Sequence, residues 1–377
     1  MNIVVAPDSF KGSISARDIC TAVEKGVLRV FPQASVVGLP LADGGEGTME
    51  NLVYASGGSK FEVVVKGPLG KPVTASVGIL GDKETVIIEM AQASGLTLVS
   101  ENEKKPFLAT SYGTGELIKY ALDRNYRKFI IGLGGSATND GGTGMLKALG
   151  VRFFSSDGKD LPEGGGALSR LDHFDDSGID PRIKESSFII ASDVTNPLCG
   201  PNGASSIFGP QKGASPEDVT ILDQALLNFS KIVQKQRQID ICQIVGGGAA
   251  GGMGAALVAF LQASIQSGID VVMDAVQFGE KVKDANFIIT GEGKLDSQTL
   301  SGKVIAGVSK MAKKHQIPVI ALCGGLELDG NQMDELGIVS GFSIVPGPCT
   351  LEGAMEKSAK WMEERTEQIM RLVKVFS

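Results

Sequence analysis

The sequence predicts an α/β protein of two domains, and three observations support this prediction. Both ends of the chain alternate short apolar segments with amphipathic segments of helical spacing, which is typical of a parallel sheet covered by helices. Residues 60–98 instead contain short apolar segments separated by Gly-Pro and Gly-Asp turns, with no helical pattern between them. The length of 377 residues is that of about two ordinary domains.

We expect the first domain to be discontinuous. It is a doubly wound, Rossmann-like parallel-sheet domain built from residues 1–59 and 280–377. The second is an inserted mixed α/β domain over residues 60–279, with a β-meander and glycine-rich loops. Because open α/β sheets bind ligands outside the carboxyl ends of their strands, we expect the active site in the cleft of this fold.

The amino-terminal segment shows the β-loop-α pattern twice. Residues 2–6 form an expected strand, apolar from residue 3 onward, and precede a polar loop. Residues 14–31 repeat apolar side chains every three to four positions, with Ser15 as a candidate helix cap. Residues 35–41 form the next strand, and a helix is expected from Thr48 to about residue 55. Each polar loop therefore follows the carboxyl end of a strand.

The remaining elements follow from the same patterns. The tripeptide Phe-Ile-Ile recurs at 129–131, 188–190 and 287–289, and an acid-bearing polar loop follows each copy, so we expect three strands that end at one site. The other expected strands are 63–65, 73–80, 85–89, 319–323 and 342–345, and the expected helices are 111–122, 141–149, 216–236, 255–267, 304–314 and 351–373.

The composition indicates which kinds of partner the protein can bind. A net charge of -7 and few aromatic residues, with four Tyr and one Trp, argue against a nucleic-acid surface. Residues 241–269 carry no charge, but glycines between 246 and 254 interrupt them, so we expect a buried loop and helix and no membrane span. The expected partner is a small-molecule substrate, and the sequence leaves open a homodimer.

The cysteines and histidines indicate the redox setting of the protein and the side chains that can act as acids or bases. Five scattered cysteines without a C-x-x-C pair indicate reduced thiols and a cytoplasmic protein. The apolar residues 3–6 lack a preceding basic stretch and are followed by Pro7, so they form a first strand and not a signal peptide. With only His173 and His315 present, carboxylates must perform the acid-base work.

The stretch GLGGSATNDGG (132–142) is the candidate phosphate site. It follows an apolar strand, its glycines allow a tight turn with exposed N–H groups, and a helix can begin at its end. Ser136, Thr138 and Asn139 add polar groups, and Asp140 would stand beside a phosphate if a divalent cation lay between them. Residues 246–254 form a second glycine-rich turn that also leads into an expected helix.

A dinucleotide site is the main alternative. Residues 132–137 fit G-x-G-x-x-A, and Asp157 follows twenty residues on. A dinucleotide helix begins within the fingerprint, however, whereas here five further residues prolong the loop and bring an acid toward the diphosphate. An NAD(P)-dependent oxidoreductase of a small hydroxy acid stays open beside a kinase. Two further alternatives stay open: a non-catalytic sensor of a hydroxy acid, and a sugar-type kinase with a GLGSSA-like loop.

Seven blocks of the sequence closely resemble the bacterial type I glycerate kinase family. They span the chain in order: APDSFKGS (6–13), ADGGEGT (42–48), GLGGSATNDGG (132–142), SDVTNPLCGPNGA (192–204), FGPQKGA (208–214), GGGAAGGMGAAL (246–257) and GEGKLDSQTLSGK (291–303). The resemblance implies ATP-dependent phosphorylation of D-glycerate, with 2-phosphoglycerate favoured over 3-phosphoglycerate, on a two-domain α/β fold.

The resemblance and the loop chemistry together give residue-level expectations for Mg²⁺, ATP and glycerate. Asp296 is the preferred base, with Asp193, Lys11 and Lys294 as further catalytic candidates. Expected phosphate contacts are Gly134, Gly135, Ser136, Thr138, Asn139, Gly247, Gly248 and Gly251; expected substrate contacts are Ser9, Lys212 and Asn196; expected metal ligands are Asp8, Asp43 and Asp140.

Overall fold

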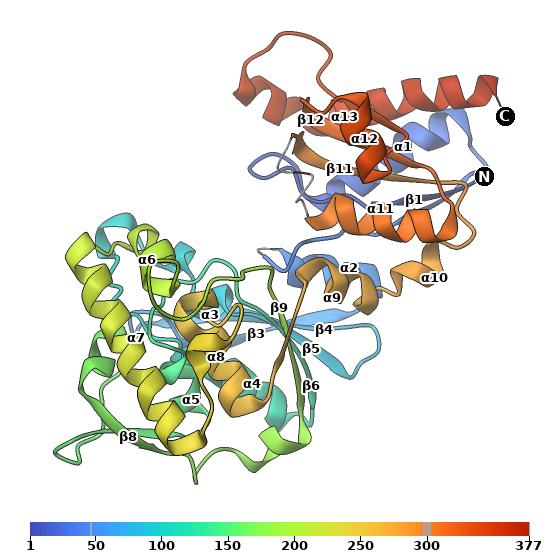
Figure 1. Ribbon diagram of the computed structural model, residues 1–377. Helices are drawn as coiled ribbons and strands as arrows, with labels where there is room; N and C mark the ends of the chain where they lie inside the picture. Colours follow the sequence, from blue (N-terminus) through green and yellow to red (C-terminus); the bar gives the residue numbers. More distant parts are fainter. Residues whose placement is uncertain (46, 297–298, 300–302, 377) are drawn as a thin grey trace. The chain divides into compact units, whose positions relative to one another are not determined.

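The computed structural model describes residues 1–376 except residue 46, residues 297–298 and residues 300–302. Parts of the blocks ADGGEGT and GEGKLDSQTLSGK therefore lie outside the described residues. The chain divides into two compact units, whose elements are labelled in Figure 1. Unit 1 comprises Met1–Asp43, Glu50–Ser56 and Ile269–Ser377, and unit 2 comprises Gly44–Met49 and Gly57–Gly268.

Unit 1 is built on a five-stranded sheet to which both chain ends contribute. Its order is β13 (Ser340–Ser343), β12 (Val319–Leu326), β11 (Phe287–Leu295), β1 (Asn2–Val5), β2 (Ser35–Gly38), and every neighbouring pair is parallel. In the central pair, Ile3 is opposite Phe287 and Val5 is opposite Ile289. The expected strands of both chain ends therefore form one parallel sheet.

Helices cover both faces of this sheet. Successive residues of β12 enter different apolar clusters: Leu322 packs with residues of α1 (Ala16–Val30) and α13 (Leu351–Val375), whereas Ala321 and Cys323 pack with residues of α11 (Lys303–His315) and α12 (Gly330–Leu336). Figure 1 shows α1 and α13 side by side. As expected, Ser15 caps α1, and its side chain accepts a hydrogen bond from Asp18 N. Shorter helices are α2 (Thr48–Ser56), α9 (Gly268–Ala275) and α10 (Phe278–Val282).

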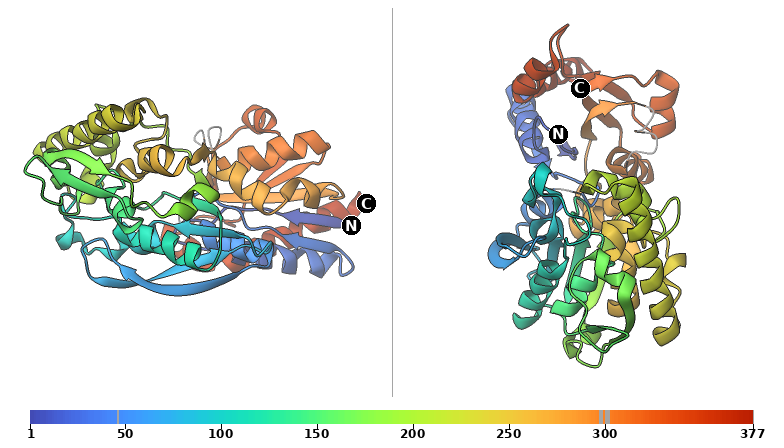
Figure 2. Two further views of the ribbon diagram at one scale, coloured as in Figure 1. Left: turned by 90° about the horizontal axis from the view of Figure 1, so that it is seen from below. Right: turned by 90° about the vertical axis from the view of Figure 1, so that its left-hand side faces the viewer.

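Unit 2 is built on a six-stranded mixed sheet. Its order is β10 (Ser264–Gln266), β9 (Ser187–Ala191), β6 (Lys128–Gly132), β5 (Thr85–Glu89), β4 (Pro72–Ile79), β3 (Ser59–Lys66). The pairs among β10, β9, β6 and β5 are parallel, and β5, β4 and β3 form the expected antiparallel meander. Figure 2 shows β3 and β4 as the light-blue ribbons at the edge of this sheet.

The core of unit 2 lies between this sheet and its helices. Phe129 of β6 and Phe188 of β9 stack with ring centroids 4.7 Å apart, so two of the three Phe-Ile-Ile strands are neighbours, while the third is β11 of unit 1. The helices are α3 (Ala91–Ser94), α4 (Tyr112–Asp123), α5 (Thr143–Ala148), α6 (Ala204–Phe208), α7 (Pro216–Arg237) and α8 (Ala249–Leu261). Single 3₁₀ turns are η1 (Leu96–Leu98), η2 (Glu101–Glu103), η3 (Gly165–Arg170), η4 (Pro181–Glu185), η5 (Pro210–Lys212) and η6 (Ile241–Gln243).

The sequence misplaced one helix end and missed several short elements. The helix expected over 255–267 stops at Leu261, because Gln262 adopts a left-handed conformation with φ 56°. Residues Ser264–Gln266 then form strand β10, which pairs with β9. The hairpin of β7 (Arg152–Ser155) and β8 (Leu171–Asp175) and helix α12 were not expected either, since these segments are short and lack a clear apolar period.

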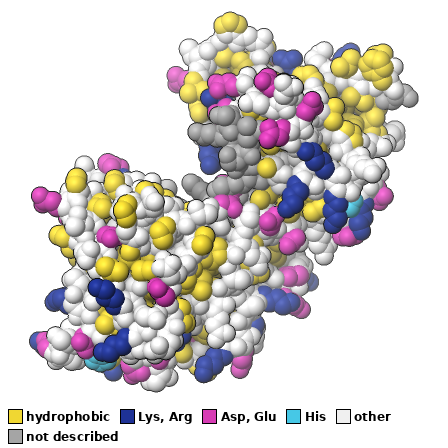
Figure 3. All heavy atoms as spheres, in the orientation of Figure 1, with side chains coloured by type: hydrophobic (Ala, Val, Ile, Leu, Met, Phe, Trp, Pro, Cys, Tyr) yellow, Lys and Arg dark blue, Asp and Glu magenta, His cyan; other side chains and the backbone are white. Residues whose placement is uncertain are grey.

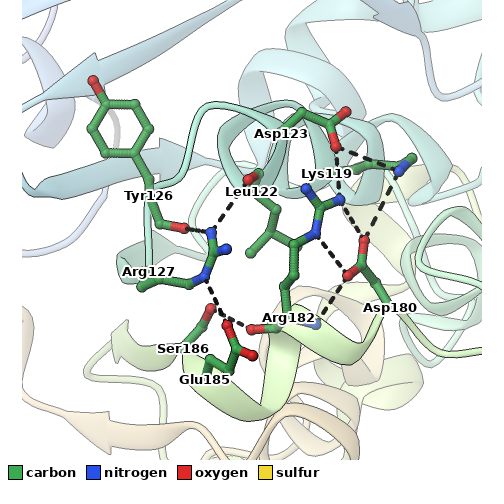
Figure 4. Close-up of polar contacts among 9 residues, drawn as sticks. All are labelled: Lys119, Leu122, Asp123, Tyr126, Arg127, Asp180, Arg182, Glu185 and Ser186. Carbon is green, nitrogen blue, oxygen red and sulfur yellow. Dashed lines mark hydrogen bonds and ion pairs between the residues drawn. The ribbon is translucent and has the colours of Figure 1, made fainter.

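An ion-pair network ties together the segments that lead into β6 and β9 (Figure 4). Arg182 donates to Asp123 Oδ1 at 2.7 Å and to both carboxylate oxygens of Asp180, at 2.9 and 2.7 Å. Hydrogen bonds from Arg182 lower the pKa of both aspartates. Arg127 donates to the carbonyl oxygens of Leu122 and Tyr126. The network thus anchors the amino-terminal ends of two parallel strands.

The surface mixes both signs of charge. On the part of the face in Figure 3 that the structure describes, Lys and Arg side chains are interspersed with Asp and Glu, without an extended basic stretch. Of the helices in the described part of the chain, none combines the length and the hydropathy that a bilayer-spanning segment needs.

Candidate functional site

The carboxyl ends of β1 and β11 lie side by side at the centre of the unit 1 sheet. Asp8 N donates to Gly291 O at 2.9 Å, and Thr290 Oγ1 donates to Ala6 O at 2.8 Å. From β1 the chain continues to β2 on one side, and from β11 to β12 on the other, so the strand order reverses between them. Such a switch point is where open α/β sheets bind their ligands.

A pocket of about 880 Å³ opens at this switch point. Its polar side carries four carboxylates, from Asp8, Asp43, Glu292 and Asp296, and two ammonium groups, from Lys11 and Lys294. Its other lining residues include Ser9, Phe10, Ser13, Gly293, Thr299, Val304, Gly324, Gly325, Ile344, Val345, Cys349, Thr350, Leu351, Ala354, Met355 and Ser358. Unit 1 therefore brings together six of the predicted site residues: Asp8, Ser9, Lys11, Asp43, Lys294 and Asp296.

Asp8 and Asp43 form an acidic pair at the ends of β1 and β2. Asp8 is half-buried, and Ser9 N donates to its Oδ1 at 2.6 Å. Burial raises the pKa of Asp8 to about 6; the hydrogen bond from Ser9 opposes this shift, and the nearby Asp43 carboxylate adds to it. Within the described residues no group of three His, Cys, Asp or Glu side chains is arranged to hold a metal ion alone. A pair of carboxylates still suits Mg²⁺, which usually takes one or two carboxylates and completes its shell with water and substrate phosphates.

Lys294 holds Asp296 at the opposite end of the polar side. Its Nζ lies 3.2 Å from Asp296 Oδ2 and 3.0 Å from Glu327 Oε2, and hydrogen bonds to Glu327 and Asp296 raise the pKa of Lys294. Asp296 N also donates to Thr299 Oγ1, at 3.1 Å. Thr299 in turn donates to Glu292, whose pKa is raised by burial. The Asp296 carboxylate is thus oriented beside a protonated amine.

In unit 2, only part of the expected phosphate loop faces solvent. Gly134 and Gly135 are exposed, whereas Ser136, Thr138 and Asn139 are buried. Their side chains serve unit 2 itself: Thr138 Oγ1 donates to Ala250 O, and Asn139 Nδ2 donates to Ser205 Oγ at 2.9 Å. In this loop the exposed peptide groups of Gly134 and Gly135 are the ones that an anion can reach.

Asp140, which was predicted to be a metal ligand, lies inside unit 2. Its side chain is fully buried, and burial raises its pKa. Oδ2 accepts from Ser111 N, Ser111 Oγ and Gly144 N at 2.9, 2.7 and 3.2 Å, and Oδ1 accepts from Gly142 N at 3.1 Å. Both carboxylate oxygens therefore bind protein donors, and the residue fixes the start of α5 against α4.

The second glycine turn, which was predicted to contact phosphate, packs against neighbouring loops of unit 2. Gly247 N donates to Ile244 O and Gly248 N to Asn196 O, so these amides already have protein acceptors. Gly251 has φ +66°, and a Cβ there would lie 2.1 Å from Thr138 O. The turn is buried, and its glycines allow backbone to pack directly on backbone. They join the turn to the 138–141 loop and the 194–198 loop.

Lys212 is a buried structural cation. Only 2% of it is exposed, and its Nζ donates to Ser136 Oγ at 2.9 Å and Thr138 O at 2.7 Å. Burial lowers the pKa of Lys212 to about 7, and the Asp140 charge opposes that shift. Lys212 was predicted to contact the substrate, and in the structure its Nζ binds groups of the loop after β6.

The loop after β9 carries the two remaining predicted residues. Asp193 is half-buried, and its Oδ1 accepts from Gly268 N at 3.2 Å. Asn196 Nδ2 donates to Asn202 O at 2.9 Å, so its amide closes the loop on itself. The blocks 132–142, 192–204, 208–214 and 246–257 thus pack together in unit 2.

The dinucleotide alternative does not fit this geometry. After Ala137 the chain continues as a loop, and α5 begins only at Thr143 and spans six residues. The glycine run is therefore separated from the helix amino terminus that a dinucleotide diphosphate requires.

Sequence reasoning missed one side of the unit 1 pocket. Ile344, Val345, Leu351, Ala354 and Met355 line it, and none belongs to a polar motif. The signal available was positional: these residues follow the carboxyl end of β13 and begin α13, at the edge where a parallel sheet binds ligands.

The fold and the pocket define an α/β enzyme whose ligand site lies at the carboxyl edge of a parallel sheet. The model of the Glycerate kinase family matches residues 3–374. The chain is 48% identical to the glycerate kinase of Bacillus subtilis (strain 168), over 100% of this chain and 98% of that protein. It is 48% identical to the glycerate 2-kinase of Escherichia coli (strain K12), over 94% and 93% of the two chains.

A solved structure agrees. The crystal structure of putative glycerate kinase 2 from Salmonella typhimurium LT2 superposes with a TM-score of 0.91 at 45% identity, and the match covers 100% of this chain and 98% of that one. The chain belongs to the glycerate kinase family. It is a phosphotransferase that acts on glycerate, and the family implies ATP as co-substrate.

The close packing at Gly251 predicts a large loss of stability on substitution. Gly251→Ala combines left-handed strain with a clash against Thr138 O, and we expect it to lower the free energy of unfolding by about 3 kcal/mol or more. Gly158→Ala is the control: Gly158 has φ +76°, but a methyl group there meets no heavy atom of the described residues within 4 Å, so strain alone should cost about 1 kcal/mol. Urea unfolding measures both. Equal losses of stability in the two variants would contradict the close packing of Gly251 against the Thr138 backbone.

The raised pKa of Asp8 predicts a pH-dependent stability. The folded state holds the Asp8 proton more tightly than the unfolded state, so the stabilisation is complete below pH 3.8 and is lost as the pH rises through about 6. Asp8→Asn should therefore be more stable than the parent protein at pH 8, by about 1 to 3 kcal/mol, and similar to it at pH 4. Asp334→Asn removes an exposed carboxylate of unit 1 and should show no such trend. A difference that does not vary with pH would refute the assignment.

Proposed function

We propose that this chain transfers the γ-phosphoryl group of ATP to the 2-hydroxyl of D-glycerate in a Mg²⁺-dependent reaction, giving 2-phosphoglycerate in preference to 3-phosphoglycerate. The observation that carries the proposal is the unit 1 pocket, where four carboxylates and two lysines gather at the switch point of a parallel sheet. The name glycerate 2-kinase, given to the Escherichia coli relative, supports the choice of hydroxyl.

Asp8 and Asp43 are the proposed magnesium ligands. Burial and, to a smaller extent, repulsion from the Asp43 carboxylate raise the pKa of Asp8, and a divalent cation would relieve that repulsion. When bound, Mg²⁺ neutralises the phosphate charge and orients the transferring group. The Ser9 peptide N–H and hydroxyl both donate to Asp8 Oδ1, and Ser9, which lines the pocket, is a proposed substrate contact.

Asp296 is the proposed base. It accepts the proton of the glycerate hydroxyl as that oxygen attacks the γ-phosphorus, while the bond from phosphorus to the bridging oxygen breaks and ADP leaves. Lys294 holds the Asp296 carboxylate in place at 3.2 Å. Lys11, exposed at the same pocket, is a proposed contact for the phosphate or the glycerate carboxylate.

The proposal assigns unit 2 two kinds of role. Gly134 and Gly135 are proposed to bind an anionic group through exposed peptide N–H groups, and Asp193 stays a predicted orienting carboxylate. The buried residues of unit 2 are proposed to act by holding these loops in shape: Ser136, Thr138, Asn139, Asp140, Asn196, Lys212, Gly247, Gly248 and Gly251.

The finer description of the fold and setting is part of the proposal. We infer that unit 1 is a doubly wound, Rossmann-like domain made from both chain ends, since its strands are all parallel and helices cover both faces. A cytoplasmic setting is supported by the five cysteines, all of which are free thiols. A homodimer stays a prediction.

A coupled assay tests the proposed reaction. Purified protein with ATP, Mg²⁺ and D-glycerate should form ADP, phosphorus NMR should identify 2-phosphoglycerate as the product, and a chelator should abolish turnover. Formation of 3-phosphoglycerate would overturn the choice of hydroxyl. An absence of ADP formation, together with enhanced NADH fluorescence on binding, would favour the oxidoreductase instead.

Replacement of Asp296 tests the base. Asp296→Asn should lower kcat by about 10² to 10⁴ and leave the Kd for ATP nearly unchanged, because only proton transfer is lost. The matched control is Glu327→Gln, which removes the other carboxylate paired with Lys294 and does not line the pocket. It should retain kcat within about threefold. Full activity of Asp296→Asn would rule out the assignment.

A further inference from the structure

The unit 1 pocket has two chemically different sides. The carboxylates and lysines of the polar side come from the ends of β1, β2 and β11. The other side is an apolar wall, formed by Val304, Ile344, Val345, Leu351, Ala354 and Met355, most of which lie between the end of β13 and the first turn of α13. A ligand that fills the pocket must therefore be strongly polar at one end and apolar at the other.

Glycerate does not match this description. It is a three-carbon acid that carries a carboxylate and two hydroxyl groups, so it has no surface that an apolar wall would recognise. A volume of about 880 Å³ lies toward the upper end of pockets that enclose ligands of several hundred daltons. Most of the pocket must accommodate a larger molecule than the phosphoryl acceptor.

The hydroxyl groups beside the wall are already engaged. Ser13 Oγ and Ser358 Oγ both donate to Met355 O, at 3.0 and 2.9 Å, and Ser343 Oγ donates to Gly324 O at 2.8 Å. These bonds fix the backbone of α13 and of the β12 end, and they leave the wall to act through contact area. A flat heterocycle is the kind of group that binds by such contact.

We propose that the wall binds the nucleoside end of the phosphoryl donor, a purine nucleoside triphosphate, whose phosphates extend toward Asp8, Asp43 and Lys11. The inference rests on the proposed kinase function and adds to it a base-binding surface that no glycine-rich motif supplies. Four carboxylates against two ammonium groups leave the polar side with two negative charges in excess, so it accepts a polyphosphate together with a divalent cation.

Filling the wall tests the inference. Ala354→Phe places a bulky ring at the wall, and the matched control Ala359→Phe makes the same change at an exposed position of the same helix outside the pocket. We expect Ala354→Phe to raise the Kd for Mg·ADP and the KM for ATP at least tenfold, with the KM for glycerate within about twofold of the parent. Ala359→Phe should have the same Kd for Mg·ADP, KM for ATP and KM for glycerate as the parent protein.

A second variant, Leu351→Asp, keeps the inference testable if Ala354→Phe does not fold. Leu351 is 73% exposed and stands at the first position of α13, where an acidic residue suits the helix dipole, so Leu351→Asp should fold normally. The substitution removes apolar surface and adds a negative charge beside the proposed nucleobase site. We therefore expect the Kd for Mg·ADP to rise about threefold to tenfold. Leu372→Asp, 57% exposed near the other end of α13, is its control.

The outcomes separate this inference from the proposed reaction, because calorimetric titration with Mg·ADP needs no glycerate. Unchanged affinity of Ala354→Phe and Leu351→Asp for Mg·ADP would overturn the inference, whether or not the enzyme phosphorylates glycerate. A raised KM for glycerate with normal nucleotide affinity would assign the wall to the acceptor and also overturn it. Loss of nucleotide affinity in a protein that fails to phosphorylate glycerate would support the wall and reject the proposed acceptor.

Discussion

The parallel pairing of β1 with β11 is the constraint on which the unit 1 site depends. It joins segments 284 positions apart, as the bond from Thr290 to Ala6 shows, and sets Asp8 beside Gly291. The carboxyl ends of parallel strands meet at one edge, so the loop after β1 and the loop after β11 must share a pocket. The predicted metal ligand Asp8 and the predicted base Asp296 need no sequence proximity, because the sheet register brings both to one pocket.

Unit 2 shows how buried polar residues can determine the course of a loop. A buried carboxylate or ammonium group is costly unless protein groups replace its lost hydration. Asp140 receives four hydrogen bonds and Lys212 donates at least two, and between them they determine the course of the loop after β6. The glycines at 248 and 251 bring neighbouring loops to backbone distance. Exposed Gly134 and Gly135 are therefore held in place by groups that are themselves inaccessible.

The sequence predicted what local patterns determine. Apolar periods located most strands and long helices, and Ser15 was correctly identified as the cap of α1. The blocks indicated the family, which the comparisons confirmed. Polarity and glycine content, however, do not reveal whether a loop faces ligand or protein. Gly248 was expected to bind phosphate, but its amide donates to Asn196 O, a partner that only the tertiary fold supplies. The apolar wall was missed for the same reason, since an apolar residue at a strand end resembles any core residue in the sequence.

The charge of the unit 1 pocket links its stability to its chemistry. With two excess negative charges, the carboxylates of the pocket repel one another, and this repulsion adds to burial in raising the pKa of Asp8. A free triphosphate would increase the repulsion, whereas a triphosphate carrying a divalent cation would lower it. The charge of the pocket therefore supports the proposal that the donor binds together with its metal ion. Because the proposed apolar wall would contribute contact area, the position of the reacting phosphate would depend on the polar side, whose residues lie at or just beyond the ends of strands of one sheet.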